Sequence, residues 1–266
     1  MVSGVWIVVL SAATAQVLPA APPQSAPPQA GFLNEAKADQ TPPVTPPKPA
    51  KALAPEMRGD IFMARKMYRE AAEAYQEAPK SAVTLNKTGI AYHQMLEFGP
   101  AEKFYRQAIK ANPKYAEAIN NLGTIYYARK SYRRAVNEYR KALRLTPDSA
   151  SVWSNLAMGY FARKDEKLAH EAFDKALSLD PNVFESHSTL GVLLQERSVE
   201  ERAKYHYFLA QTYAKAGDND HALQYIRKAL EEGYKERKKI GADPAFAALK
   251  DLPEFKELLA SEPRVL

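Results

Sequence analysis

Small and aromatic residues recur from residue 56 onward at one long period, with polar residues between them. Proline occurs at 113, 147 and 181, each 34 residues after the one before. Five columns of small or aromatic residues keep the same step: Gly89, Gly123 and Ala157; Tyr92, Tyr126 and Tyr160; Ala101, Ala135 and Ala169; Tyr105, Tyr139 and Phe173; Ala108, Ala142 and Ala176. Together with the prolines, these make six columns in register. They indicate an internal repeat, which is considered before any local motif when the fold is predicted.

Each repeat is predicted to consist of two helices that pack against each other. The small residue of the first helix allows a close approach to the second, and the aromatic residues fill the space between them. Proline ends the second helix, because it has no amide hydrogen and restricts the residue before it. Glycine is scarce, with 11 residues, while Ala, Glu, Lys and Leu are plentiful. The fold class is therefore predicted to be all-α.

The best copy of the repeat carries the residues of a known family. It reads Trp153-x2-Leu156-Ala157-x2-Tyr160, then Ala169-x3-Phe173, then Pro181. This resembles the tetratricopeptide repeat, which has W-x2-L-G-x2-Y, A-x3-F and P in this order. The resemblance implies a right-handed superhelical solenoid of stacked antiparallel helix pairs, in which the first helix of each pair lines a concave wall.

The repeat columns predict where the folded part begins and ends. The solenoid is predicted over 55–241, with repeats near 55–80, 82–113, 116–147 and 150–181, an extra helix at 183–196 and a last pair at 199–232. One continuous helix is expected from about 199 to 216, because Ala210 and Tyr213 belong to two overlapping patterns. Ala78 lies only 30 residues before Ala108, so the turn containing Pro79 is expected to be four residues shorter than the others. Residues 242–266 are predicted to form short capping helices that cover the open end of the stack.

The N-terminal residues have a different composition. An apolar run over 5–10, followed by Ala13-Thr14-Ala15, is typical of a signal peptide over 1–15 that is cleaved before Gln16. The run is too short to span a bilayer. Residues 16–54 are rich in proline and alanine and are expected to be a disordered, extended linker, since this composition buries too little apolar area to fold. These features predict an exported protein, periplasmic or associated with the cell envelope, and leave open whether the apolar run is cleaved or kept as an anchor.

Composition and charge narrow the chemistry. The chain has no cysteine, which excludes a thiol nucleophile and zinc sites built on cysteine. Residues 1–55 hold three lysines and two acidic residues, so 34 basic and 29 acidic residues follow them. Positive charge spread over such a mixed surface favours solubility rather than binding of nucleic acid. We find no Gly-rich phosphate loop, no G-x-S-x-G and no H-E-x-x-H, and therefore predict no enzyme, no cofactor and no metal.

The candidate binding site is the wall formed by the first helices of the repeats. Polar hydrogen-bonding side chains and a few apolar ones suit an extended peptide, because its backbone amides need polar partners and its side chains need shallow pockets. The residues predicted to line the wall are Asn86, Ile90, His93, Asn120, Thr124, Tyr127, Ser154, Met158, Phe161, Ser188 and Val192. Asn121 and Lys87 resemble part of the clamp with which some members of the family grip a C-terminal carboxylate. Glu117 stands where that clamp needs a basic residue, so an acidic C-terminal ligand is not expected.

The sequence favours a non-catalytic adaptor or scaffold that binds a peptide or protein segment. Two alternatives stay open: a self-associating structural component of an envelope or secretion assembly, and a regulatory subunit of an envelope enzyme. Basic clusters, which include Arg106 and Arg134, are placed on second helices or turns. Contact with anionic lipid or a cell-wall polymer is the expectation for these clusters, and no nucleic-acid partner is expected. The sequence does not name the binding partner, the pathway or the oligomeric state.

Overall fold

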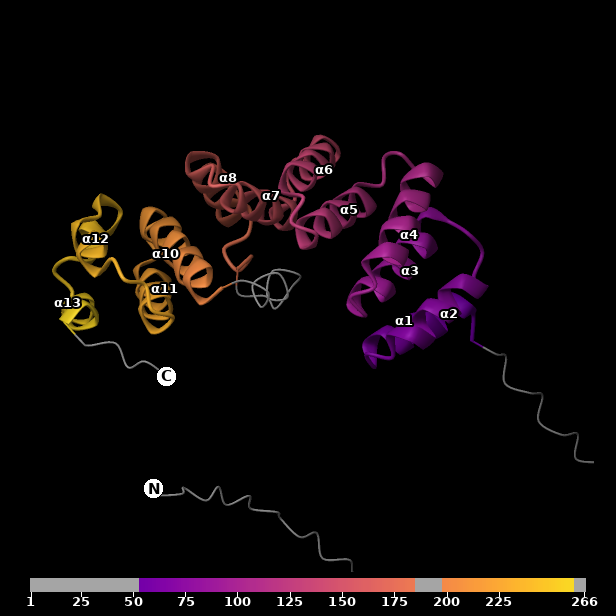
Figure 1. The fold of residues 1–266 in the computed structure, drawn as a ribbon, viewed down its shortest axis with the longest axis horizontal. Coiled ribbons are helices and arrows are strands. Elements are labelled where there is room, and N and C mark those ends of the chain that lie inside the picture. The colour runs from indigo at the N-terminus through magenta and orange to yellow at the C-terminus, as the bar shows by residue number, and fades with distance from the viewer. Residues whose placement is uncertain (1–52, 185–197, 261–266) are drawn as a thin grey trace, which may run out of the picture. The chain divides into compact units, whose positions relative to one another are not determined.

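The computed structural model describes residues 53–184 and 198–260, and in these residues every regular element is a helix (Figure 1). The elements are α1 (Pro55–Ala64), α2 (Tyr68–Glu77), α3 (Ala82–Gln94), α4 (Phe98–Ala111), α5 (Ala116–Ala128), α6 (Tyr132–Leu145), α7 (Ala150–Ala162), α8 (Glu166–Leu179), α10 (Val199–Lys215), α11 (Asn219–Glu231), α12 (Arg237–Ala242), the 3-10 helix η1 (Pro244–Leu249) and α13 (Pro253–Ala260). The predicted signal peptide, nearly all of the predicted linker and extra helix, Ser188 and Val192 lie outside the described residues.

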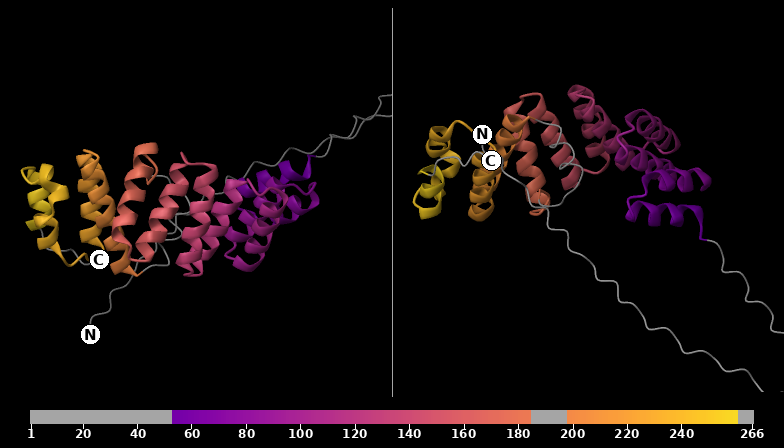
Figure 2. Two further views of the ribbon diagram at one scale, coloured as in Figure 1. Left: turned by 90° about the horizontal axis from the view of Figure 1, so that it is seen from above. Right: turned by 60° about the horizontal axis from the view of Figure 1, so that its bottom comes forward.

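Consecutive helices form pairs that stack on one another. Contacts within a pair join α1 to α2, α3 to α4, α5 to α6, α7 to α8 and α10 to α11. Contacts between pairs join α2 to α3, α4 to α5, and α6 to α7. The connections are short, which makes neighbouring helices turn back on each other (Figure 2). The stacked helix pairs predicted from the repeat columns are confirmed.

The turn inside each pair has one geometry throughout the described repeats. Its middle residue has a positive φ of 59° at Lys66, 60° at Leu96, 57° at Lys130, 64° at Lys164 and 82° at Gly217. In the third pair, the amide of Lys130 donates to the carbonyl of Tyr127, and the amide of Ser131 donates to that of Tyr126. These two bonds define a Schellman motif, which satisfies carbonyls that the helix end would leave unpaired. Four of the five turns place a lysine or leucine where glycine is the usual residue.

The close approach predicted at the small column is seen at Gly123. A Cβ atom added to this residue would lie 2.6 Å from the ring of Tyr139 and 3.3 Å from the carbonyl oxygen of Ala135. Tyr139 itself is fully buried, as are Tyr105 and Phe173 in the same column. The aromatic ring of the second helix therefore lies directly against the backbone of the first.

The core is divided between a large and a small cluster. The large cluster extends from α4 to α13. The small cluster consists of Ala71, Ala72, Tyr75 and Ala91, which belong to α2 and α3. Helix α1 adds a single buried residue, Gly59, and its Phe62 and Met63 are partly buried against the small cluster. The first pair is thus held by much less buried apolar surface than the pairs that follow.

Two details differ from the sequence-based expectation. The connection before α3 is as long as those before α5 and α7, and α2 is the shorter element, with 10 residues against 14 in α4, α6 and α8. The four missing residues therefore come from the helix, about one turn of it, which keeps the remaining side chains on the same face. In the C-terminal part, α12 was not predicted. The segment Pro244–Leu249 is a 3-10 helix that is interrupted at Phe246, whose φ and ψ (−97° and 18°) are not helical.

Candidate ligand-binding surfaces

The first helices of the repeats are joined by a ladder of asparagines. The amide nitrogen of Asn121 on α5 donates to the oxygen of Asn86 on α3 at 3.1 Å, and that of Asn155 on α7 donates to the oxygen of Asn120 at 2.9 Å. Asn120 also donates to Asn121 at 3.4 Å. The ladder coincides with the contacts of α5 with α3 and α7. Consecutive first helices are therefore joined by one continuous polar strip, which we call the first-helix surface. Asn86 and Asn155 are buried in it, and Asn120 and Asn121 are partly exposed.

Charged groups extend this strip toward α1. The amide nitrogen of Asn86 donates to Oε1 of Glu117 at 2.9 Å, and Nζ of Lys87 lies 2.8 Å from carboxylate oxygens of both Glu56 and Asp60. Burial opposes the charged form of Lys87, but the hydrogen bonds to Asp60 and Glu56 raise its pKa above the ordinary value. Lys87 is thus engaged with α1, and Asn121 and Glu117 are engaged with Asn86 of α3, so none is arranged as a carboxylate clamp.

The structure places most of the predicted wall residues inside the helix contacts. Asn86, Thr124, Tyr127, Ser154 and Met158 are buried, and Met158 has no exposed surface at all. The expectation that these side chains are presented on an open wall is corrected by their burial. Tyr127 packs against Tyr132 of α6, and Thr124 accepts a hydrogen bond from Tyr139 of the same helix. Ile90, His93, Asn120 and Phe161 retain partial exposure. Phe161 packs edge-on against Tyr205 and Phe208 of α10.

His93 is a packing residue in this structure. Its ring makes edge contacts with Phe98 and Tyr105, at centroid distances of 5.8 and 6.4 Å. Burial lowers the pKa of His93 to about 4, so the imidazole is neutral near pH 7. A neutral imidazole between aromatic rings contributes shape and hydrophobic contact rather than proton transfer.

Two other histidines also have structural partners. His170 stacks on Phe208 at 4.3 Å between ring centroids, and burial lowers its pKa to about 4. Nδ1 of His206 lies 2.7 Å from Oε2 of Glu232, while burial still lowers the pKa of His206. Over residues 53–184 and 198–260, no three His, Asp or Glu side chains are grouped so as to hold a metal ion. In the same ranges no helix has the length and apolar character needed to cross a membrane.

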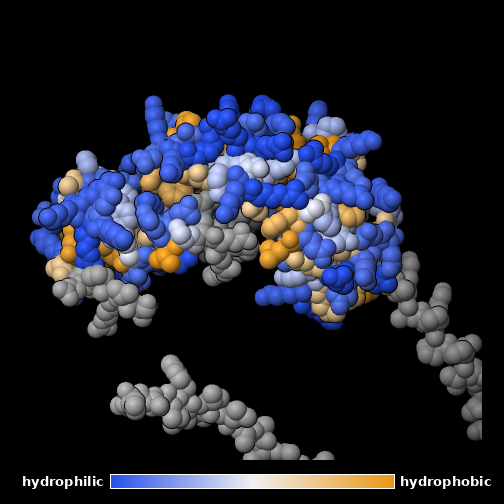
Figure 3. Space-filling view, in the orientation of Figure 1, coloured by the Kyte–Doolittle hydropathy of each residue, from blue (hydrophilic) through white to orange (hydrophobic). Residues whose placement is uncertain are grey.

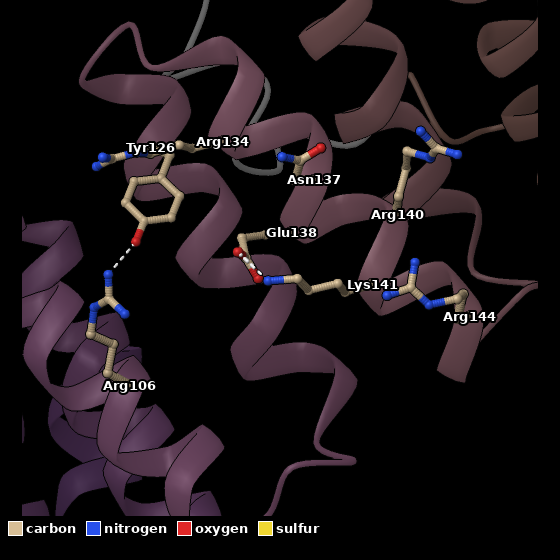
Figure 4. A pocket seen from close by; sticks show the side chains of 8 residues that line it. All are labelled: Arg106, Tyr126, Arg134, Asn137, Glu138, Arg140, Lys141 and Arg144. Atoms are coloured by element: carbon tan, nitrogen blue, oxygen red, sulfur yellow. Dashed lines mark hydrogen bonds and ion pairs between the residues drawn. The ribbon is translucent and has the colours of Figure 1, made fainter.

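A basic groove lies on the second helices, between α4 and α6 (Figure 4). It encloses about 590 Å³ and is lined by Arg106, Tyr126, Arg134, Asn137, Glu138, Arg140, Lys141 and Arg144. The guanidinium groups of Arg106 and Arg134 lie 6.0 and 5.8 Å from the ring centre of Tyr126, within range of a cation–π contact. Five of the lining residues are basic and one, Glu138, is acidic; Arg106 is also paired with Glu102, which lies outside the lining.

An apolar pocket adjoins the basic groove and shares two of its residues. It encloses about 400 Å³ and is lined by Arg140, Leu143, Arg144, Trp153, Leu156, Tyr160, Leu168, Glu171 and Ala172. The indole nitrogen of Trp153 donates to the carbonyl of Pro147 at 2.8 Å, which fixes the ring at one side of the pocket. In Figure 3, most of the visible described surface is hydrophilic, with separate hydrophobic patches.

The sequence predicted basic residues on the second helices but missed this grouping. Arg134, Lys141 and Arg144 follow a spacing that brings them to one side of α6. Arg106 lies 34 residues before Arg140, at the equivalent position of the preceding repeat. The 34-residue period could therefore have predicted that these two arginines lie on the same surface. The position of Trp153 and Leu168 in the adjoining pocket depends on contacts between helices, which sequence spacing does not reveal.

Comparison with known families agrees with this geometry. Models described as tetratricopeptide repeat match residues 104–137, 150–183 and 203–232, and a model described as TPR repeat matches 123–162. The chain is a tetratricopeptide repeat protein. The matches include α10 and α11, so this tetratricopeptide protein carries the pattern on both sides of residues 185–197. Tetratricopeptide repeats form a module for protein–protein interaction, and the fold of this chain matches such a module.

Several solved structures are similar to this tetratricopeptide protein. A crystal structure of MamA shares 22% identity with a TM-score of 0.46, covering 68% of this chain and 96% of that chain. TTC0263, a thermophilic TPR protein of Thermus thermophilus, shares 18% identity with a TM-score of 0.47, covering 69% and 92%. The first TPR of Spaghetti (RPAP3), bound to the HSP90 peptide SRMEEVD, shares 23% identity with a TM-score of 0.39, covering 43% and 91%. The comparison with curated proteins gave no match.

Proposed function

We propose that this protein is a non-catalytic adaptor that binds an extended peptide or protein segment along its first-helix surface. The observation that carries the proposal is the asparagine ladder, which joins α3, α5 and α7 into one polar strip. An extended segment needs a surface longer than one helix pair, and hydrogen-bonding side chains suit its backbone amides.

The ladder leaves capacity for a ligand. An asparagine side chain has two donor hydrogens and an acceptor oxygen, and each ladder bond uses one of these. Asn120 is only partly buried, and Glu117 and Ser151, which stand at equivalent ends of α5 and α7, are exposed. A segment lying across α5 and α7 would therefore reach Asn120 without displacing the buried Met158 and Ser154.

The test is a peptide library displayed on phage and selected on the full chain. Selected peptides are then measured against Asn120→Ala and against Asn182→Ala, a matched control whose exposed asparagine follows α8 and lines neither the groove nor its pocket. We expect Asn120→Ala to weaken binding about tenfold, because the ligand loses a hydrogen bond in a partly buried site, and Asn182→Ala to bind as the unchanged chain does. Selection of no peptide, or equal binding by both variants, would overturn the proposal.

We also propose that the protein is exported, as the apolar run before Ala13-Thr14-Ala15 predicts. The test is expression in a bacterium that has a periplasm, followed by fractionation and N-terminal sequencing. Export with cleavage gives a periplasmic protein that begins at Gln16. A cytoplasmic protein that retains residues 1–15 would contradict the proposal, and Ala15→Arg serves as a control that blocks cleavage without changing the repeats.

A further inference from the structure

The basic groove contains arginines that the fold itself does not use. Helix α6 carries Arg133, Arg134, Arg140, Lys141 and Arg144 against the single acid Glu138. Nζ of Lys141 pairs with Oε1 of Glu138 at 2.7 Å, and Arg106 pairs with Glu102 at 3.0 Å. In the part of the chain that the structure describes, no carboxylate pairs with Arg140 or Arg144.

The arrangement of these two arginines has a cost. Arg140 and Arg144 are four residues apart on α6, so they are neighbours on one face, and like charges at this spacing destabilise a helix. Both side chains are exposed. An anion between them would remove the repulsion, and the planar guanidinium groups are suited to hold carboxylates through paired hydrogen bonds.

The adjoining apolar pocket restricts the class of anionic ligand that fits the groove. Arg140 and Arg144 line both cavities, so a ligand that fills the two must carry negative charge directly beside an apolar group. Leu168 at the pocket is 42% exposed, and its uncovered surface adjoins the walls formed by Trp153 and Leu156. A polyphosphate or polysaccharide chain has no side chain for this pocket, whereas a polypeptide can place Leu or Phe next to Asp or Glu.

We infer that the basic groove and its apolar pocket form a second docking surface, for an acidic protein segment in which Asp or Glu flanks a large apolar residue. The carboxylates bind Arg140, Arg144 and Arg134, and the apolar side chain enters between Trp153 and Leu168. This surface is built from second helices and is separate from the first-helix surface. The inference rests on the proposed function in one respect, that the partner is a protein.

The test measures the full chain with a fluorescent peptide, Gly-Glu-Asp-Leu-Glu-Phe-Asp-Glu-Gly, by anisotropy. Arg140→Glu combined with Arg144→Glu is expected to lower the affinity about tenfold or more, because two charge-assisted contacts become repulsive. Lys235→Glu combined with Lys238→Glu is the matched control, since these lysines are exposed outside the groove and change the net charge equally. The control variant is expected to bind within about twofold of the unchanged chain.

The apolar pocket has its own matched pair of variants. Leu168→Ser is expected to weaken binding several-fold, while Leu145→Ser, which changes a comparably exposed leucine outside the pocket, leaves it unchanged. A peptide with Ser in place of Leu and Phe should bind the unchanged chain more weakly by the same several-fold factor. It should bind Leu168→Ser and the unchanged chain with equal affinity.

Several results would overturn the inference. These are absence of saturable binding, equal binding by both charge variants, or binding of vesicles containing phosphatidylglycerol through Arg140 and Arg144 when the peptide does not bind. Failure here is distinguishable from failure of the proposed function. Peptides selected on the first-helix surface respond to Asn120→Ala and not to the groove variants, so either site can fail while the other holds.

Discussion

Acid should destabilise the repeats through His93, by an amount that the structure sets. Burial among Phe98 and Tyr105 lowers the pKa of His93 to about 4, against an ordinary value of 6.5. Below pH 6.5 the unfolded chain takes up a proton at this residue and the folded chain does not. The stability due to neutral His93 is therefore fully present above pH 6.5 and is lost as the pH falls toward 4.

The magnitude follows from the difference in pKa. Between about pH 7 and pH 5, the free energy of unfolding should fall by about 2 kcal/mol through His93 alone. His170 and the carboxylates also titrate, so the useful quantity is the difference between the unchanged chain and His93→Leu. Leucine removes the titrating group and keeps an apolar side chain against the same rings.

The assay is urea denaturation followed by circular dichroism at several pH values, for both chains. We expect the difference in unfolding free energy between the two chains to change by about 2 kcal/mol as the pH falls from about 7 to 5, with the unchanged chain losing more. An NMR titration of the His93 imidazole provides a direct check. Parallel curves, or a His93 that titrates near its ordinary value of 6.5, would refute the reasoning.

Three further changes test the packing of the repeats, each by urea denaturation. Gly123→Val should destabilise the chain by about 1–3 kcal/mol, because its Cβ would meet the Tyr139 ring at 2.6 Å, and unchanged stability would contradict that contact. Lys130→Gly should stabilise it by roughly 0.5–1 kcal/mol, because glycine adopts the positive φ of 57° without steric strain, and a loss of stability would refute this account of the turn. Asn155→Ala should cost about 1 kcal/mol through its ladder bond to Asn120, and a neutral result would show that this bond adds nothing to stability.

The sequence predicted the helix pairs well and the exposure of side chains less well. The columns that contain Gly123 and Tyr139 lie on the two helices of one pair. The repeat pattern therefore predicts that these two residues pack together. Burial of Met158 in the large cluster depends on the approach of several helices, which a period does not specify. The shorter α2 shows the same limit, because a missing helical turn and a shorter loop remove equal numbers of residues and differ only in three dimensions.

The basic groove shows which part of a site could be found from the chain alone. Arg106 and Arg140 stand at equivalent positions of two successive repeats. The side chains they meet are also repeat-equivalent: Tyr126 lines the groove with Arg106, and Tyr160 lines the pocket with Arg140. Arg134 and Leu168 are likewise 34 residues apart, so the two cavities differ in that a leucine replaces a basic residue. The repeated arginines could be identified from the sequence. The apolar side chain beside them, which restricts the class of ligand, could be identified only from the structure.

The small cluster that holds the first pair has a consequence for where the folded array begins. Gly59 is the single buried residue of α1, Phe62 and Met63 lie partly buried against the small cluster, and Glu56 and Asp60 pair with Lys87 of α3. Local opening needs less free energy where fewer apolar contacts are broken. We therefore expect the first pair to open at a lower free energy than the repeats that share the large cluster, so that the N-terminal edge of the folded array is the first part to open.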